Sequence, residues 1–177
     1  MAERNAQAVK PIRTALTGDD GVDLTLIELL FFAYRDFTSD PDQILAEYGF
    51  GRAHHRILHF VNRMPGLTVA ELLDVLQITK QSLARVLKQL IDTEHVVQVT
   101  GIRDRRQREL YPTAKGRALA LALARPQSRR IHAALEAAGA GTRADVERFL
   151  KAMVNPELRA QIDNLPGPGL ERSDGDA

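Results

Sequence analysis

Residues 67–92 read LTVAELLDVLQITKQSLARVLKQLID, and this stretch decides the fold. Thr68 is followed three residues later by Glu71, the capping-box spacing that marks the start of a helix. Thr79 is suited to cap a second helix over residues 80–92, because its hydroxyl accepts from a free backbone N–H of the first turn. The stretch therefore predicts two helices joined by a tight turn.

The second helix has two chemically different faces at 100° per residue. The apolar face carries Leu83, Val86, Leu87, Leu90 and Ile91, and the opposite face carries Gln81, Ser82, Arg85, Lys88 and Gln89. Arginine, lysine, glutamine and serine are the side chains that meet base edges in a DNA major groove. Taken alone, the pattern favours a solvated amphipathic surface helix.

A β-hairpin is expected directly after this helix. Residues 96–99 are a short β-branched run, residues 108–111 are the expected returning strand that ends at Pro112, and the polar loop 101–107 joins them. A helix pair followed by a hairpin predicts a winged helix-turn-helix over about residues 53–112.

Positive charge is concentrated on this unit. Six cations and two acids lie within residues 101–117, whereas the whole chain has a net charge of +1. Such concentration is typical of phosphate binding. The expected DNA-binding residues are Thr79, Lys80, Gln81, Ser82, Arg85 and Lys88 on the helix, and Arg103, Arg105 and Arg106 at the hairpin tip. Asp104 is expected to pair with a neighbouring arginine and so hold the tip in shape.

The rest of the chain predicts a mainly α fold. Residues 23–36 form an expected helix that is apolar almost all round and ends before Ser39-Asp40-Pro41, and further helices are expected over 114–163, kinked or broken near Pro126. We expect a flexible segment over 1–22, one domain over 23–163 with dimerisation helices at its two ends, and a disordered tail over 164–177. A helix buried in the core of a monomer is the alternative for residues 23–36.

Composition excludes several classes of protein. The 177 residues contain no cysteine, which excludes disulfides and thiolate metal sites. No apolar run reaches the roughly 20 residues that span a bilayer, so we expect a soluble cytoplasmic protein with no membrane partner. His55 and His59 have a spacing that suits a metal, but no carboxylate accompanies them at ligand spacing, so we expect no metal and no other cofactor. No catalytic motif is present, and an enzyme is not expected.

Three stretches resemble the MarR family of winged helix-turn-helix transcription regulators. They are residues 67–90, the looser pattern over 52–58, and the wing pattern of Asp104-Arg105-Arg106 with Leu110 and Thr113-Ala114-Lys115-Gly116. The resemblance implies a homodimer with intertwined terminal helices, recognition helices in successive major grooves, wing arginines in flanking minor grooves, and repression that a small ligand relieves. Thr93-Glu94-His95 departs from the pattern, since the family usually has a glycine there.

A pocket for a small aromatic or anionic effector is implied between the dimerisation helices and the winged helix. Its candidate residues are Phe32, Arg35, His55 and His59, with Arg35 suited to an anionic group. The favoured function is a sequence-specific, ligand-responsive repressor that binds a pseudo-palindromic DNA site as a homodimer. The alternative is a winged-helix module that binds an acidic protein partner through its basic hairpin.

Overall fold

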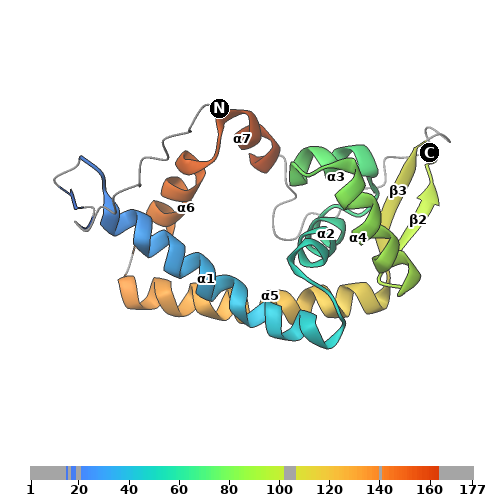
Figure 1. The fold of residues 1–177 in the computed structure, drawn as a ribbon, viewed down its shortest axis with the longest axis horizontal. Coiled ribbons are helices and arrows are strands. Elements are labelled where there is room, and N and C mark those ends of the chain that lie inside the picture. The colour runs from blue at the N-terminus through green and yellow to red at the C-terminus, as the bar shows by residue number, and fades with distance from the viewer. Residues whose placement is uncertain (1–14, 16, 19–20, 102–106, 140, 164–177) are drawn as a thin grey trace, which may run out of the picture. The chain divides into compact units, whose positions relative to one another are not determined.

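The computed structural model describes residues 15, 17–18, 21–101, 107–139 and 141–163. The elements are α1 (Leu24–Glu47), α2 (Arg52–Arg63), β1 (Leu67–Thr68), α3 (Val69–Leu76), α4 (Lys80–Asp92), β2 (Val96–Thr100), β3 (Arg108–Pro112), α5 (Ala114–Ala138), α6 (Thr142–Met153) and α7 (Pro156–Asp163), as Figure 1 shows. The predicted mainly α fold with a small β-hairpin wing is confirmed. The chain divides into two compact units at the Asp36–Phe37 boundary, which lies within α1.

The two predicted caps of the helix pair are present. The Thr68 hydroxyl accepts from the Glu71 backbone N–H at 3.2 Å, and the Thr68 N–H donates to the Glu71 carboxylate at 2.7 Å. Gln77 ends α3 in the left-handed region with φ of 50°, which turns the chain sharply into α4. These local interactions fix the angle at which α4 leaves the turn.

The winged helix is built around one core and a three-stranded antiparallel sheet in the order β1-β3-β2. In the register of the hairpin, Val99 pairs with Glu109 and Val97 pairs with Tyr111. Side chains from the helices and from β3 are completely buried together, among them Ile57, Leu58, Leu72, Leu83, Leu90 and Leu110. This core holds α4 with its apolar face inward.

The expectation that the first helix ends near Asp36 is wrong. α1 continues to Glu47, and Pro41 lies inside it. Proline has no N–H, so the carbonyl four residues earlier, that of Phe37, loses its usual donor. The side-chain amide of Gln127 donates to the Phe37 carbonyl at 3.1 Å and replaces that bond. The compensating residue lies 90 positions away in the sequence, where local patterns do not reveal it.

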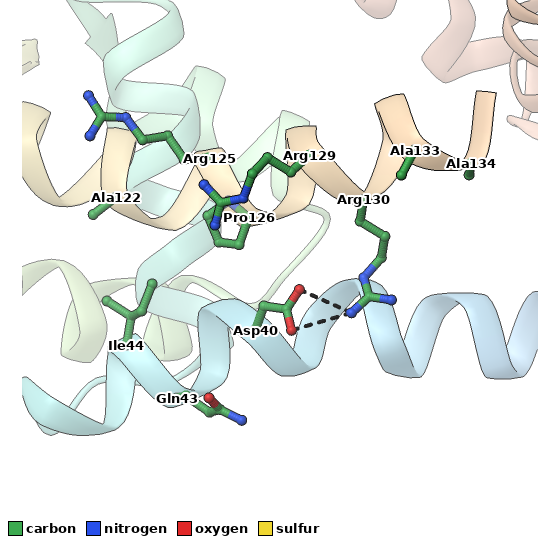
Figure 2. A pocket seen from close by; sticks show the side chains of 10 residues that line it. All are labelled: Asp40, Gln43, Ile44, Ala122, Arg125, Pro126, Arg129, Arg130, Ala133 and Ala134. Atoms are coloured by element: carbon green, nitrogen blue, oxygen red, sulfur yellow. Dashed lines mark hydrogen bonds and ion pairs between the residues drawn. The ribbon is translucent and has the colours of Figure 1, made fainter. Parts of the chain in front are cut away.

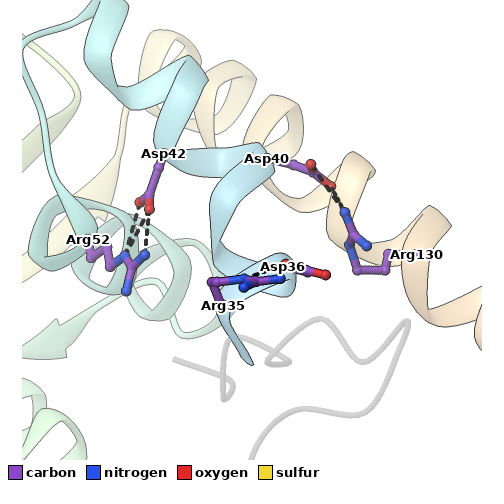
Figure 3. Close-up of polar contacts among 6 residues, drawn as sticks. All are labelled: Arg35, Asp36, Asp40, Asp42, Arg52 and Arg130. Atoms are coloured by element: carbon purple, nitrogen blue, oxygen red, sulfur yellow. Dashed lines mark hydrogen bonds and ion pairs between the residues drawn. The ribbon is translucent and has the colours of Figure 1, made fainter. Parts of the chain in front are cut away.

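α5 is likewise one helix through Pro126, so the expected break there is absent. Its first half carries Leu119 and Leu123 into the core. Ion pairs attach neighbouring helices to α1, with Asp42 binding Arg52 at 2.7 Å and Asp40 binding Arg130 at 3.1 Å, as shown in Figure 3. Both pairs are partly exposed, and each contributes at most about 1 kcal/mol.

α6 has no buried residue. Val146, Phe149, Leu150 and Met153 recur along it at helical spacing and are 36–53% exposed. Apolar side chains on the first half of α1 are exposed too, including Phe31 and Phe32. Within the described residues, no helix combines the length and apolar character needed to cross a bilayer.

Candidate nucleic-acid interface

The amino end of α4 is an exposed cap. The Thr79 hydroxyl accepts from the Ser82 backbone N–H at 3.2 Å and lies 3.0 Å from the Ser82 hydroxyl. The other first-turn N–H groups of a helix have no partner four residues back, and the helix dipole makes this end attractive to anions. Such an end is suited to meet a phosphate.

The two faces of α4 differ as the sequence predicts. Leu83, Val86, Leu87 and Leu90 are buried, and the predicted polar residues are exposed. Within the part of the chain that the structure describes, the side chains of Lys80, Gln81 and Arg85 have no hydrogen-bonding or ion-pair partner. The exposed face therefore presents free donors and acceptors to solvent.

Two residues of the polar face are engaged with the protein itself. The Lys88 ammonium binds Asp92 at 2.5 Å, so a phosphate would compete with a carboxylate for it. Gln89, which the angular pattern groups with the exposed polar set, directs its side-chain oxygen to the Nε2 of His54 on α2, 2.9 Å away. Its pairing with a histidine 35 residues earlier has no local sequence signal.

The hairpin is present, and its tip lies outside the described residues. Arg103, Asp104, Arg105 and Arg106 belong to that tip, so their predicted roles stay predictions. At its base, Arg108 donates to the Thr100 hydroxyl across the two strands. This cross-strand contact joins the strands just before the tip.

The turn between α4 and β2 is held against the start of α5. The Thr113 hydroxyl donates to the Glu94 carbonyl at 2.7 Å, and the Lys115 ammonium donates to the Thr93 carbonyl at 2.9 Å. A Cβ on Gly116 would meet the His95 carbonyl oxygen at 1.9 Å, so only glycine fits. This close approach requires a glycine at position 116, and so accounts for the glycine in the Thr113–Gly116 motif.

The predicted effector residues lie in different units of the chain. In the first unit, the Arg35 guanidinium sits 5.0 Å from the centre of the Phe32 ring and donates to Asp36 at 2.9 Å. In the second, burial lowers the pKa of both His55 and His59, and the nearby charge of His59 lowers the pKa of His55 further. The pocket that would join these residues stays a prediction.

A cleft that the sequence did not predict lies between the carboxyl half of α1 and the middle of α5 (Figure 2). Its volume is about 1060 Å³, and its lining includes Ile44, Pro126 and Ala122 together with three arginines of α5. Arg130 is paired with Asp40, whereas Arg125 and Arg129 have no ion-pair partner among the described residues. The cleft thus has an apolar floor beside the Arg129 guanidinium, whereas the Arg125 side chain extends away from α1 (Figure 2). The sequence feature that could have pointed to this cleft is a pair of arginines one helical turn apart, Arg125 and Arg129, with Pro126 between them.

Comparison with known proteins decides the family. The sequence pattern that describes the MarR family matches residues 48–107. The HTH-type transcriptional regulator PetP of Rhodobacter capsulatus is 51% identical over 139 residues, covering 78% of this chain and 84% of PetP. The chain belongs to the MarR family. It is therefore a DNA-binding transcriptional regulator and not an enzyme.

Solved structures agree with this fold. The MarR protein of Peptoclostridium difficile has a TM-score of 0.67 at 18% identity, covering 84% of this chain and 97% of that one. A MarR family protein of Mycobacterium tuberculosis, solved in complex with p-aminosalicylic acid, has a TM-score of 0.51 at 26% identity, covering 72% and 97%. The transcriptional regulator SlyA has a TM-score of 0.63 at 15% identity, covering 78% and 96%.

Proposed function

We propose that this MarR family regulator binds a pseudo-palindromic DNA site as a homodimer, represses transcription from it, and is released by a small anionic ligand. In each half-site, α4 enters the major groove. The predicted wing residues Arg103, Arg105 and Arg106 reach the flanking minor grooves. The repressor role is carried over from the resemblance to the family.

The observation that carries the DNA-binding mode is the free polar face of α4. Arg85 has the fork geometry that binds guanine O6 and N7, and Gln81 can bind adenine N6 and N7. Both are exposed and have no side-chain partner among the described residues, while the opposite face of the helix is buried. Lys80 and the exposed cap at Thr79 are placed to bind the backbone phosphates that flank those bases.

The homodimer is supported by the exposed apolar stripe of α6, namely Val146, Phe149, Leu150 and Met153. An apolar stripe of this kind, left in water, marks a protein contact surface. Two copies joined there would present two recognition helices. Half-sites about 34 Å apart along one face of the duplex would then give a palindromic site.

The DNA-binding mode is tested with the duplex that the wild-type protein selects from a random pool. Arg85→Ala should weaken binding to that duplex by about 1–3 kcal/mol and relax preference at one base position. Replacing Arg105 and Arg106 together by alanine should weaken binding to all sequences and reduce the slope of log affinity against log salt by about 2. Arg148→Ala, on the face of α6 turned away from the apolar stripe, is the control for loss of an arginine. Unchanged base preference in Arg85→Ala would contradict the proposal.

The ligand is proposed to bind in the cleft between α1 and α5, in place of or in addition to the pocket predicted at Phe32, Arg35, His55 and His59. The Arg129 guanidinium, which has no ion-pair partner among the described residues, lies beside an apolar floor and suits a carboxylate on an aromatic or aliphatic body. The complex of the M. tuberculosis family member with p-aminosalicylic acid supports this ligand class.

The ligand site is tested by titrating aromatic carboxylates, p-aminosalicylic acid first, into the protein in a calorimeter. Binding that is lost in Arg125→Ala/Arg129→Ala and kept in Arg35→Ala places the ligand in the α1–α5 cleft. The reverse result places it in the predicted pocket and removes the cleft from the proposal.

A further inference from the structure

His54 lies in the first turn of α2, is only 9% exposed, and uses both ring nitrogens. Its Nδ1 is 3.0 Å from the backbone nitrogen of Gly51, and its Nε2 is 2.9 Å from the side-chain oxygen of Gln89 on α4. One imidazole therefore connects the turn before α2 with the recognition helix.

The hydrogen-bond partners of this ring determine which of its two nitrogens carries the hydrogen. The Gly51 N–H can only donate, so Nδ1 accepts and carries no hydrogen. The neutral ring then carries its hydrogen on Nε2, which donates to Gln89. Since each nitrogen has one role and one partner, turning the ring over would break both bonds.

Neighbouring aromatic rings fix the plane of the imidazole. Phe50 stacks on His54 with ring centres 4.6 Å apart and planes 5° from parallel, and Phe50 and His95 pack edge to face with ring centres 5.2 Å apart. The backbone carbonyl of Gln89 is held as well, because the Thr93 hydroxyl donates to it at 2.7 Å. Gln89 is thus restrained through both its side chain and its main chain.

The core holds the apolar face of α4, and the restraint at Gln89 limits further rotation of α4 about its own axis. Gln89 lies one turn beyond Arg85, so a rotation at one residue moves the other by the same angle. A side-chain tip lies about 5–6 Å from a helix axis, and a rotation of about 20° shifts it by roughly 2 Å. Such a shift exceeds the tolerance of a bidentate hydrogen bond to a base.

We propose that His54 is a positioning residue for sequence reading: through Gln89 it sets the rotation of α4, so that Arg85 and Gln81 meet the edges of the correct bases. His54 need not contact DNA in this role. The inference rests on α4 being the recognition helix, and Arg85→Ala tests that assignment separately.

Two substitutions separate the two bonds of His54. In His54→Asn, the amide oxygen can take the place of Nδ1 and accept from Gly51, but the side chain is too short to reach Gln89. In His54→Gln, the amide nitrogen can take the place of Nε2 and donate to Gln89, while the bond to Gly51 is lost. Gln89→Leu removes the acceptor on α4, and Gln89→Glu keeps it.

The measurement is the ratio of affinities for the selected duplex and for a scrambled duplex of the same composition, at a temperature where each full-length variant is folded by circular dichroism. We expect His54→Asn and Gln89→Leu each to lower this ratio about tenfold, with affinity for the scrambled duplex nearly unchanged. His54→Gln and Gln89→Glu should keep it within about threefold of the wild type. The affinity ratio of the double variant His54→Asn/Gln89→Leu should be no lower than that of the single variant with the lower ratio. Both substitutions remove the same hydrogen bond, so their effects should not add.

His132→Asn is the control, since His132 is exposed on α5. A wild-type ratio in His54→Asn would overturn the proposal, and with a loss in Gln89→Leu it would assign Gln89 a direct DNA contact. Equal loss in His54→Asn and His54→Gln, with both duplexes bound less tightly, would also overturn it, because a general structural defect would then explain the result. If Arg85→Ala keeps its base preference, the assignment of α4 fails instead.

Discussion

The winged helix and α6 differ in where their apolar side chains lie. Leu58, Leu83 and Leu110 come from α2, α4 and β3 and bury one another completely. Phe149 and Leu150 on α6 are each about half exposed, and α6 buries no residue at all. The winged helix thus contains its own core, whereas α6 leaves its apolar stripe exposed to solvent, and this stripe is the surface proposed for dimerisation.

The largest expected effect comes from placing charges on the α6 stripe. Phe149→Asp together with Leu150→Asp should abolish dimerisation, because both copies would lose burial worth about 1.5–3 kcal/mol for each large apolar side chain. Sedimentation equilibrium should show a monomer. This monomer should bind the selected duplex far more weakly than the wild-type protein does. The far-UV circular dichroism of the winged helix should be retained. Arg148→Ala, on the face of α6 turned away from the stripe, is the control, and a dimer of wild-type stability in the double variant would remove α6 from the interface.

The next effect belongs to the self-contained unit. Gly116→Ala should lower the free energy of unfolding by about 3 kcal/mol, because the new Cβ meets the main-chain oxygen of His95, which cannot move as a flexible side chain would. Gly51→Ala is the matched control, since a Cβ there meets nothing within 4 Å. Urea unfolding checks both variants. Equal stabilities would show that the contact between α5 and the α4–β2 turn yields easily.

How far the sequence predicts the molecule depends on how local the interactions are. The caps at Thr68 and Thr79, the buried face of α4 and the hairpin follow from residues within a few positions of each other, and all were predicted correctly. The continuity of α1 through Pro41 depends on Gln127, 90 residues away, and was missed.

The same distinction holds for the site. The exposure of Arg85 follows from helical spacing, but the engagement of Gln89 depends on His54 in another helix. The cleft beside Arg125 forms only when α1 and α5 pack together. Contacts between distant segments are thus what local patterns leave undetermined.

A smaller effect is expected in how the stability of the folded protein depends on pH. Burial and the charge of Lys115 lower the pKa of His95, which is 1% exposed, below 6.5. Well above pH 6.5 the ring is neutral in both the folded and the unfolded chain, so it adds no pH dependence there. As the pH falls below 6.5, the unfolded chain takes up a proton first and stability decreases, until the lowered pKa of the folded state is reached.

Thermal unfolding between pH 7.5 and 5 measures this dependence. His95→Asn keeps a donor for the Thr93 hydroxyl and should make the decrease in melting temperature shallower. His55 and His59 act in the same direction, since burial lowers the pKa of each, so part of the decrease should remain. The same substitution at exposed His132 is the control, and an unchanged slope in His95→Asn would show that this ring takes up its proton as readily in the folded as in the unfolded chain.

The smallest effect concerns the turn that joins α4 to the wing, where the winged helix departs from the family pattern. Glu94 adopts a φ of 61°, a left-handed conformation that costs a residue with a Cβ about 1–2 kcal/mol. Glu94→Gly should relieve this cost and, after the greater freedom of glycine in the unfolded chain is subtracted, stabilise the protein by about 0.5–1 kcal/mol. Glu94→Ala, which keeps a Cβ, separates relief of the backbone from loss of the charge and should bring no gain. Urea unfolding of both variants decides between them: equal stabilisation by alanine would mean that the carboxylate, and not the backbone, is what disfavours this turn.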